Sequence, residues 1–417
     1  MLSVEEAAAR ITTSAAPLDV ETVELLDAAG RVLAESIIAP ITLPHWDNSA
    51  MDGYAVRAAD IAGASASTPV TLPVQETIAA GAFPTLPVMA GTATRIMTGA
   101  PMPSGADTVV RVEDTDGGIE QVSIRDARDV QKNVRPRGED IREGDVLLAE
   151  GQPLAAAQIG VLASCGIGTV PVYRRPRVAI ISSGDELVDL DRFDEVRAGR
   201  RIVSSNRYTL TALIRDAGGI PVDLGIAADT PESLRATLTQ AMTGFDLIIT
   251  TAGISVGEFD HTRAVLADLG ATLDFWKIRM RPGAPVGSGR LGGTPWIGLP
   301  GNPVSTMVTF ELFVRPAIRR MLGHRALHRV PVDVRLAEPV RIGARLTHFL
   351  RAIVAPGADG VLQARLTGPQ GSGILTSMST ANALLIVPVD RPEIAVGELA
   401  HALLLDDAGA RREAFTL

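Results

Sequence analysis

Between residues 178 and 321, short apolar runs alternate with longer stretches of helical periodicity. The run 247–249 has no polar interruption, which is typical of a strand buried on both faces of a parallel sheet. Strands are predicted at 178–181, 221–224, 246–250, 274–280 and 295–299, and helices at 205–217, 231–242, 261–269 and 303–321. This alternation predicts a doubly wound α/β sheet.

The flanking regions have different patterns. Residues 3–16 predict a helix with Ser3 as N-cap and Glu6 as its capping-box partner. Short β-rich runs with Gly/Pro turns follow at 108–112, 121–124 and 146–148, then a helix at 153–165 and a strand at 169–173. After residue 330, runs at 331–336, 348–354, 361–366, 383–387 and 398–405 predict a small β-barrel or sandwich.

Composition narrows the class of protein. A chain of 417 residues is too long for a single hydrophobic core, so several domains are expected. Its 48 acidic and 39 basic side chains give a net charge of −9, which argues against nucleic acid as the main partner. The single cysteine, Cys165, excludes an internal disulfide and suits a reducing cytoplasm. The acidic N-terminus lacks the apolar stretch of a signal peptide, and no apolar run approaches about 18 residues, so no membrane span is expected.

Three loops at predicted strand ends carry chemistry. They are the segments 182–187 (SSGDEL), 250–260 (TTAGISVGEFD) and 299–305 (LPGNPVS), in the last of which Asn302 is expected to cap a helix. Ligands bind at the carboxyl ends of strands in open α/β sheets, and carboxylates with phosphate suit Mg²⁺. Each acid alone also fits an N-cap or surface position; together with Asp229 they favour a nucleotide-like ligand with a metal.

The alternating segment 275–281 places Lys277, Arg279 and Arg281 on one face of its predicted strand. These cations form either a solvated strand face or a wall for oxyanions. The residues show no nucleophile–base pair, no Walker A loop and no GxGxxG, and the histidines lack metal-ligand spacing.

Seven motifs in order resemble the molybdopterin molybdenumtransferase family (MoeA), which includes the C-terminal domain of gephyrin. They are NSAMDGYA (48–55), MTGAPMPSGAD (97–107), RGED (137–140), SSGDEL (182–187), TTAGISVGEFDHT (250–262), FWKIRMRPGAP (275–285) and LPGNPVS (299–305). The resemblance covers essentially the whole chain. It implies a molybdenum insertase that transfers molybdate onto adenylylated molybdopterin with Mg²⁺, giving molybdenum cofactor and AMP.

The resemblance also implies an architecture. Residues 1–50 with 141–173 would form an N-terminal helical/β dimerisation domain, 51–140 an inserted β-rich module, 174–328 a molybdopterin-binding-like α/β domain, and 329–417 a C-terminal β-barrel. Family members form homodimers whose cleft is completed by the partner's inserted module. A molybdopterin adenylyltransferase would supply the substrate in the cytoplasm.

The same resemblance implies roles for individual residues. Catalytic residues would be Asp260, Glu186, Asp229, Lys277 and Arg281, with Asp52 and Asp140 from the other subunit. Metal ligands would be Asp185, Glu186, Asp229 and Asp260. Substrate-binding residues would be Thr98, Ser183, Gly184, Thr250, Gly253, Ser255, Gly257, Pro300, Asn302, Pro303, Ser305, Arg351 and Ser372.

Three positions depart from the family pattern. Ala252 stands where a second glycine is common, Ala284 replaces the lysine of PGKP, and Arg281 replaces a lysine. A methyl group at residue 252 is harmless at negative φ and obstructive at positive φ. These departures keep two alternatives open: a gephyrin-like dimeric scaffold that binds a partner peptide, and a pterin- or nucleotide-binding sensor without turnover.

Overall fold

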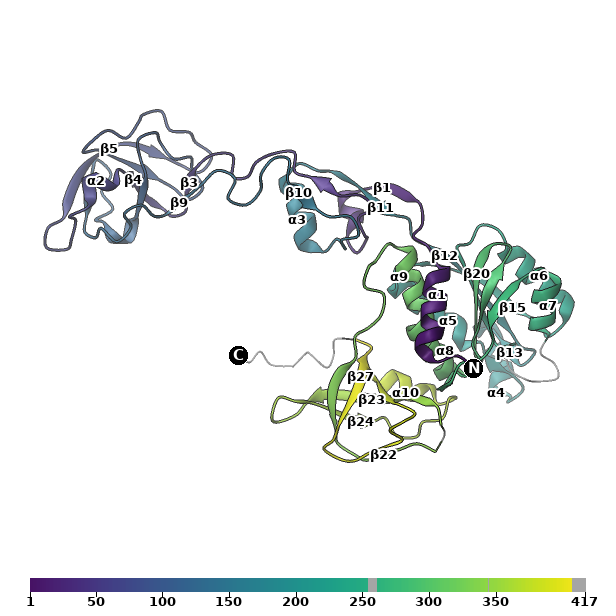
Figure 1. The fold of residues 1–417 in the computed structure, drawn as a ribbon. Coiled ribbons are helices and arrows are strands. Elements are labelled where there is room, and N and C mark those ends of the chain that lie inside the picture. The colour runs from purple at the N-terminus through teal and green to yellow at the C-terminus, as the bar shows by residue number, and fades with distance from the viewer. Residues whose placement is uncertain (254–260, 344, 407–417) are drawn as a thin grey trace. The chain divides into compact units, whose positions relative to one another are not determined.

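The computed structural model describes residues 1–253, 261–343 and 345–406, which fall into two compact units (Figure 1). Unit 1 comprises Met1–Ala34, Gly151–Ile159 and Thr169–Leu417, and unit 2 comprises Glu35–Glu150 and Gly160–Gly168. Helix α3 (Ala156–Ser164) crosses the division between them. Each unit is described by itself.

The centre of unit 1 is a six-stranded sheet in the order β15-β12-β16-β20-β19-β17. Its bounds are β15 Ile220–Ala227, β12 Arg177–Ser183, β16 Leu247–Thr251, β20 Thr294–Leu299, β19 Gly287–Leu291 and β17 Thr272–Phe275. The first four strands are parallel, while β19 runs antiparallel to both of its neighbours. The α/β prediction is therefore confirmed, and β19 is a strand that the sequence patterns missed.

Helices cover both faces of this sheet. They are α1 Val4–Ser14, α5 Ser205–Asp216, α6 Pro231–Ala241, α7 Thr262–Asp268, α8 Pro303–Thr309 and α9 Arg315–Met321. Helices α1, α5, α8 and α9 share one core with Ile180 and Ile249, whereas α6 and α7 share another with Ile181 and Ile248. Neighbouring residues of each strand thus face opposite layers, which explains the uninterrupted apolar runs.

The capping residues in the sequence correctly predicted where two helices begin. The Ser3 hydroxyl accepts from Glu6 N at 3.1 Å and Ser3 N donates to the Glu6 carboxylate at 2.7 Å, so the capping box is confirmed. Thr230 caps α6, with Pro231 in its first turn.

The long helix predicted at 303–321 is interrupted, because α8 passes into α9 through a π-helical turn at Phe310–Val314.

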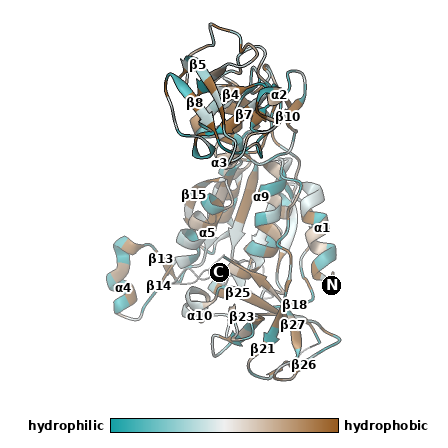
Figure 2. Cartoon of the chain, turned by 90° about the vertical axis from the view of Figure 1, so that its left-hand side faces the viewer, coloured by the Kyte–Doolittle hydropathy of each residue, from teal (hydrophilic) through white to brown (hydrophobic). Residues whose placement is uncertain are grey.

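The C-terminal part of unit 1 is a closed barrel, in which β23, β24, β21, β27 and β25 pair in that order and β25 returns to β23. The bounds are β21 Val332–Leu336, β23 Thr347–Pro356, β24 Leu362–Leu366, β25 Ala383–Val387 and β27 Leu399–Leu404; β22 Val340–Arg341 pairs with β26 Glu393–Ile394, and α10 spans Leu375–Thr380. All five predicted strands are confirmed. Figure 2 shows hydrophobic colouring along the barrel strands.

One strand prediction in unit 1 is wrong, and one set of elements was not predicted. The strand predicted at 274–280 ends at Phe275, and the chain then turns so that Ile278 N donates to Ala284 O at 2.9 Å. Farther on, β18 (Met280–Arg281) pairs with β23 of the barrel instead of extending the sheet. The sequence patterns also missed an excursion between β12 and α5, made of β13 Leu187–Val188, a 3₁₀ turn at Leu190–Arg192, α4 Phe193–Arg197 and β14 Ile202–Val203 (Figure 2).

Unit 2 is rich in β-structure, as expected for its central residues. Its five-stranded sheet has the order β7-β4-β6-β5-β8, with β4 Gly53–Val56, β5 Val70–Ile78, β6 Ala93–Ile96, β7 Thr108–Arg111 and β8 Gln121–Ile124. Shorter elements are β2 Ile37–Ile38, β3 Asn48–Ser49, α2 Ala58–Ile61, β9 Val134–Arg135 and β10 Val146–Leu148. Strands β1 Val20–Glu24 and β11 Thr169–Tyr173 pair within unit 1.

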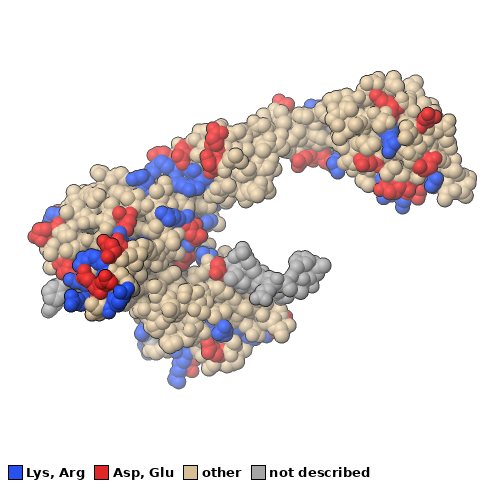
Figure 3. Space-filling view, turned by 180° about the vertical axis from the view of Figure 1, so that it is seen from behind, with Lys and Arg blue, Asp and Glu red and all other residues tan. Residues whose placement is uncertain are grey.

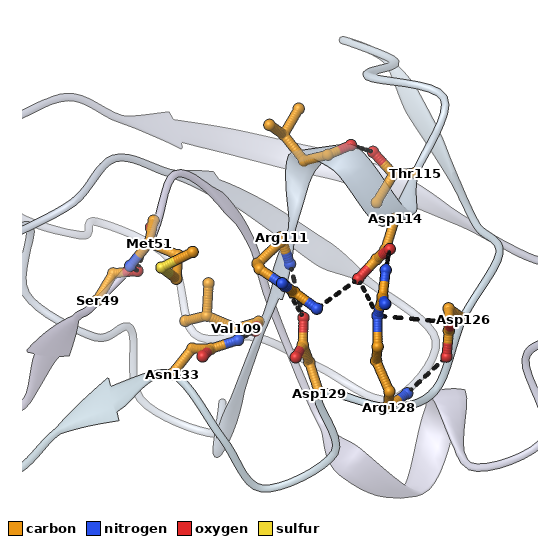
Figure 4. Close-up of polar contacts among 11 residues, drawn as sticks. Ser49, Met51, Val109, Arg111, Asp114, Thr115, Asp126, Arg128, Asp129 and Asn133 are labelled. Carbon is orange, nitrogen blue, oxygen red and sulfur yellow. Dashed lines mark hydrogen bonds and ion pairs between the residues drawn. The ribbon is translucent and has the colours of Figure 1, made fainter.

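An ionic network holds the segment that follows β7 in unit 2 (Figure 4). Arg111 bonds Asp129 through Nε at 3.0 Å and Asp114 through Nη2 at 3.2 Å, and Arg128 also bonds Asp114. The hydrogen bond from Arg128 holds the pKa of the Asp114 carboxyl below its ordinary value. Because both carboxylates are buried, their pairing with arginine satisfies charges that would otherwise be costly.

A similar clamp joins the entry of β12 to the entry of β16. Arg174 donates two hydrogen bonds of 2.8 Å to the Asp246 carboxylate, and Arg177 N adds a third at 2.7 Å. Burial alone would raise the pKa of Asp246, but the hydrogen bonds from Arg174 and Arg177 outweigh it and lower the pKa. The ionised carboxylate therefore stabilises the folded chain.

Asp246→Asn is expected to lower the unfolding free energy at pH 7 by about 1–3 kcal/mol. Because the folded-state pKa is depressed, this stabilisation is present above the unfolded-state pKa of about 4 and disappears as pH falls through the folded-state pKa. The midpoints of thermal unfolding of wild type and variant should therefore converge in acid. Asp274→Asn, which removes the exposed pair with Arg10, is the control and should change little. A gap that persists in acid would contradict this account.

On the face seen in Figure 3, acidic and basic side chains lie intermingled over both units. Among the described helices, none is long and apolar enough to cross a membrane.

Candidate functional site

A cavity of about 370 Å³ lies where β12, β16 and β20 end, and we call it the sheet-edge cavity. Parallel strands bring their carboxyl ends to one edge, so loops far apart in sequence meet there. Its lining comprises Ser183, Glu186, Leu187, Ile202, Val203, Ser204, Ser205, Asn206, Thr251, Ala252, Gly253, Pro285, Pro300, Gly301, Asn302 and Pro303. Six predicted site residues are thereby brought together: Ser183, Glu186, Gly253, Pro300, Asn302 and Pro303.

The turn after β16 has an unusual backbone. Ala252 and Gly253 both adopt φ +68°, the left-handed region that glycine enters without strain and alanine does not. Ala252 N donates to Leu299 O at 3.1 Å, which ties the turn to the end of β20. The condition under which a methyl group at residue 252 is unfavourable is therefore met.

Ala252→Gly is expected to stabilise the chain by about 1 kcal/mol, because glycine relieves the left-handed strain. The measurement is the midpoint of thermal unfolding. Ala284→Gly is the matched control: Ala284 does not have a positive φ, so glycine there should lower the midpoint. Equal shifts in both variants would show that the turn stores no strain.

The two adjacent acids of the SSGDEL loop go to different places. Asp185 N donates to the Asp229 carboxylate at 3.2 Å and Asp229 N donates to the Asp185 carboxylate at 3.1 Å, so these two acids clamp the ends of β12 and β15 together. Asp185, with Gly184, lines a separate cavity of about 520 Å³ beside the excursion. Glu186 lines the sheet-edge cavity instead. Among the described residues, no group of three His, Cys, Asp or Glu side chains could hold a metal ion.

The LPGNPVS loop contributes through its backbone. Asn302 occupies the N-cap position of α8, but its side chain makes no capping hydrogen bond, so that expectation is wrong. Thr306 instead donates through Oγ1 to Pro300 O at 2.6 Å and holds the loop from within the helix. Ser305 is buried in α8, and its carbonyl accepts from Thr309.

Asn206 is a cavity residue that the sequence analysis missed. Its side-chain amide, on the first turn of α5, donates to Gly301 O at 2.7 Å and joins α5 to the LPGNPVS loop. An asparagine in the first turn of a predicted helix was the available signal. Thr250, in contrast, is buried in β16 outside the lining, and its neighbour Thr251 takes that place.

A cationic cavity of about 430 Å³ lies beside the barrel, and we call it the barrel cavity. Arg281, Arg341, His348 and Arg351 line it, and none of its described lining residues is acidic. Burial and the charge of Arg281 lower the pKa of His348, so the imidazole is neutral near pH 7. Lys277, Arg279 and Arg281 are all exposed, but of the three only Arg281 lines this cavity.

Arg351 is the most deeply placed of these cations, with no exposed surface. Its guanidinium donates to Ser377 Oγ at 3.0 Å and to Gly371 O at 2.9 Å. Burial lowers the pKa of Arg351. Ser372, the predicted neighbour, accepts from Val304 N through its carbonyl at 3.2 Å and so connects this loop to α8.

In unit 2, the Asp52 carboxylate accepts from Thr98 N and Thr98 Oγ1, both at 2.7 Å. These hydrogen bonds, led by the backbone one, lower the pKa of Asp52. Asp140 is exposed, and its N–H donates to Leu43 O at 3.2 Å. Asp52 and Thr98 thus meet as a pair. The predicted residues Ser255, Gly257 and Asp260 lie outside the described residues.

Comparison with known proteins gives three consecutive family matches. Residues 2–166 match the MoeA N-terminal region (domain I and II), 179–320 the probable molybdopterin binding domain, and 333–405 the MoeA C-terminal region (domain IV). The chain is 40% identical over 381 residues to molybdopterin molybdenumtransferase 2 of Mycobacterium tuberculosis, covering 90% of this chain and 93% of the relative. It is 36% identical over 408 residues to the molybdopterin molybdenumtransferase of Bacillus subtilis, covering 97% and 94%.

Solved structures agree with these matches. The crystal structure of the molybdopterin biosynthesis moeA protein from Pyrococcus horikoshii OT3 superposes with a TM-score of 0.84 at 29% identity, covering 97% of this chain and all of that one.

Proposed function

The chain belongs to the molybdopterin molybdenumtransferase family, and from this membership we propose that it is a molybdenum insertase. The reaction places molybdenum from molybdate on the dithiolene sulfurs of adenylylated molybdopterin. Molybdate gives up one oxygen, which leaves with the two thiol protons as water, and one water cleaves the phosphoanhydride bond to the adenylyl group, which gives molybdenum cofactor and AMP.

The observation that carries the assignment is the different charge of two cavities in the same compact unit. Among the described residues, no lysine or arginine lines the sheet-edge cavity, whereas Arg281, Arg341, Arg351 and the neutral His348, and no acid, line the barrel cavity; of these arginines, Arg341 pairs with Glu393. A tetrahedral dianion such as molybdate is favoured in the second cavity by Arg281 and Arg351. The volume of the sheet-edge cavity and the apolar side chains among its lining residues suit a heterocycle.

The remaining predicted residues take roles in this scheme. Gly253, in the turn after β16, and Ser183, at the end of β12, would offer a backbone N–H and a hydroxyl to a phosphate. Pro300, Asn302 and Pro303 would border the pterin side, whereas Thr250 and Ser305 are buried in β16 and α8. Lys277, which is exposed after β17, and Asp260, Ser255 and Gly257 keep the roles that the family resemblance implies.

Mg²⁺ fits the acids at the ends of β12 and β15. In the Asp185–Asp229 clamp, one oxygen of each carboxylate accepts a backbone N–H and the other is left for a hard cation. Asp185 and Asp229 would hold the ion, which would supply positive charge to offset that of the phosphoanhydride oxygens. The chain's own residues position the pterin and the molybdate.

The assembly follows from the same family. We propose a cytoplasmic homodimer with the four-part domain division given above, supplied with substrate by a molybdopterin adenylyltransferase. In this dimer, the partner's cleft would receive Asp52, Thr98 and Asp140. The hydrogen bonds from Thr98 would keep the Asp52 carboxylate ionised there. Nothing in the relatives above favours the scaffold that binds a partner peptide.

The test is AMP release. Purified protein with adenylylated molybdopterin, Mg²⁺ and molybdate is expected to release AMP and form molybdenum cofactor, measured by chromatography. Omitting molybdate is the control for simple hydrolysis. Bound substrate without AMP release would overturn the insertase and leave a sensor or scaffold.

A further inference from the structure

Glu186 is the one charged residue among the described residues that line the sheet-edge cavity. Its carboxylate folds over Gly184: a Cβ built on that glycine would lie 2.6 and 2.8 Å from the two carboxylate oxygens. Gly184 has φ +145°, a conformation that side chains rarely allow, so this close approach requires glycine. Glycine at residue 184 therefore leaves the space that the Glu186 carboxylate occupies.

This carboxylate has no partner among the described side chains. None of the ion pairs or hydrogen bonds of the described residues includes Glu186 Oε1 or Oε2, and the side chain is exposed at the cavity. Its neighbour Asp185 is bonded to Asp229 on the side of the excursion cavity. Glu186 is thus separated from the two acids with which a shared metal site would group it.

The walls around Glu186 indicate what it faces. Leu187, Ile202 and Val203 come from the excursion, and Pro285 and Pro300 come from the loops on the other side. The rest of the described lining is mostly neutral polar side chains, such as Asn206 and Asn302, and glycine. Apolar side chains together with neutral polar groups and one free carboxylate suit a planar heterocycle that presents two adjacent N–H donors. The 2-amino-4-oxopyrimidine ring of a pterin has such an edge, formed by N3–H and the 2-amino group.

We propose that Glu186 determines specificity for the pterin ring by accepting both donors of this edge, and that it is not a metal ligand. The proposal rests on the proposed function, because it names the part of that substrate which the sheet-edge cavity recognises. A charged acceptor paired with two donors gives the ring a fixed orientation as well as binding energy.

The test compares free pterin with lumazine, in which an oxygen replaces the 2-amino group. Equilibrium titrations at pH 6.5, followed by ligand fluorescence, are expected to give wild-type protein about a tenfold preference for pterin. Glu186→Gln should reverse this preference, because the amide offers one acceptor to N3–H and one donor to the 2-oxo group. Glu195→Gln removes an acid of the same excursion outside the cavity and should leave the preference unchanged.

Several results would overturn the proposal. Wild-type protein that binds both rings equally, or neither ring, excludes recognition of this edge. If Glu186→Gln keeps the preference for pterin but raises the Mg²⁺ concentration needed for half-maximal AMP release, Glu186 is a metal ligand. The proposed function is tested separately: AMP release without any ring preference refutes only the role of Glu186, and a reversible preference without AMP release refutes only the insertase.

Discussion

Gly253→Ala is expected to lower the rate of AMP release by at least about 100-fold. A Cβ at residue 253 would lie 2.0 Å from Thr262 Oγ1 and 3.0 Å from Thr262 Cβ, and the residue has φ +68°. Thr262 is buried at the start of α7. The strain and the clash together should cost about 2–4 kcal/mol of stability, or else move the turn and deform the sheet-edge cavity.

A matched control separates strain from clash. Gly270 has φ +76° but nothing within 4 Å of a built Cβ, so Gly270→Ala should lose only about 1 kcal/mol and retain full AMP release. Adding Thr262→Ala to Gly253→Ala removes the oxygen at 2.0 Å and should restore part of the activity. If Gly253→Ala behaved like Gly270→Ala in both assays, the turn would not belong to the site.

The parts of the fold that the sequence predicted are those set by local chemistry. Uninterrupted apolar runs identified β12, β16 and β20 because helices cover both faces of their sheet. Ser3 and Thr230 identified helix starts because a cap depends on residues within one turn. The strand ends then correctly predicted which loops meet at the sheet-edge cavity.

The failures have tertiary causes. The segment 275–281 alternates because Ile278 and Met280 are buried between exposed residues. Met280 lies in β18, which pairs with the barrel strand β23, so no strand of the central sheet continues there. The excursion lacks a periodic apolar pattern because ion pairs such as Arg207–Asp189 hold it. Likewise, the burial of Arg351 comes from the barrel and the 369–371 loop closing around it, which no local pattern encodes.

Arg351→Met is expected to raise the molybdate concentration needed for half-maximal AMP release by about 100-fold. The guanidinium is fully buried, yet its described partners are neutral: Ser377 Oγ and the carbonyls of Pro369 and Gly371. Although burial lowers its pKa, arginine stays charged near neutral pH, so Arg351 brings to the barrel cavity a positive charge that no carboxylate among its described partners offsets. An oxyanion gains from that charge, and methionine removes it while keeping much of the volume.

Thermal unfolding with and without molybdate should distinguish a loss of molybdate binding from a loss of folding stability in Arg351→Met. Arg351→Met removes three hydrogen bonds, but it also removes the cost of keeping an uncompensated charge buried. Because these two effects oppose each other, the unfolding free energy of the variant without ligand should stay within about 1 kcal/mol of wild type. At 100 times its Kd, molybdate should stabilise the wild-type protein by about 2.7 kcal/mol and so raise its midpoint of thermal unfolding. The midpoint of Arg351→Met should not rise. Arg391→Met, which removes an exposed barrel arginine paired with Glu398, should respond to molybdate like wild type. Equal molybdate responses in all three proteins would remove Arg351 from the oxyanion site and place molybdate elsewhere in the molecule.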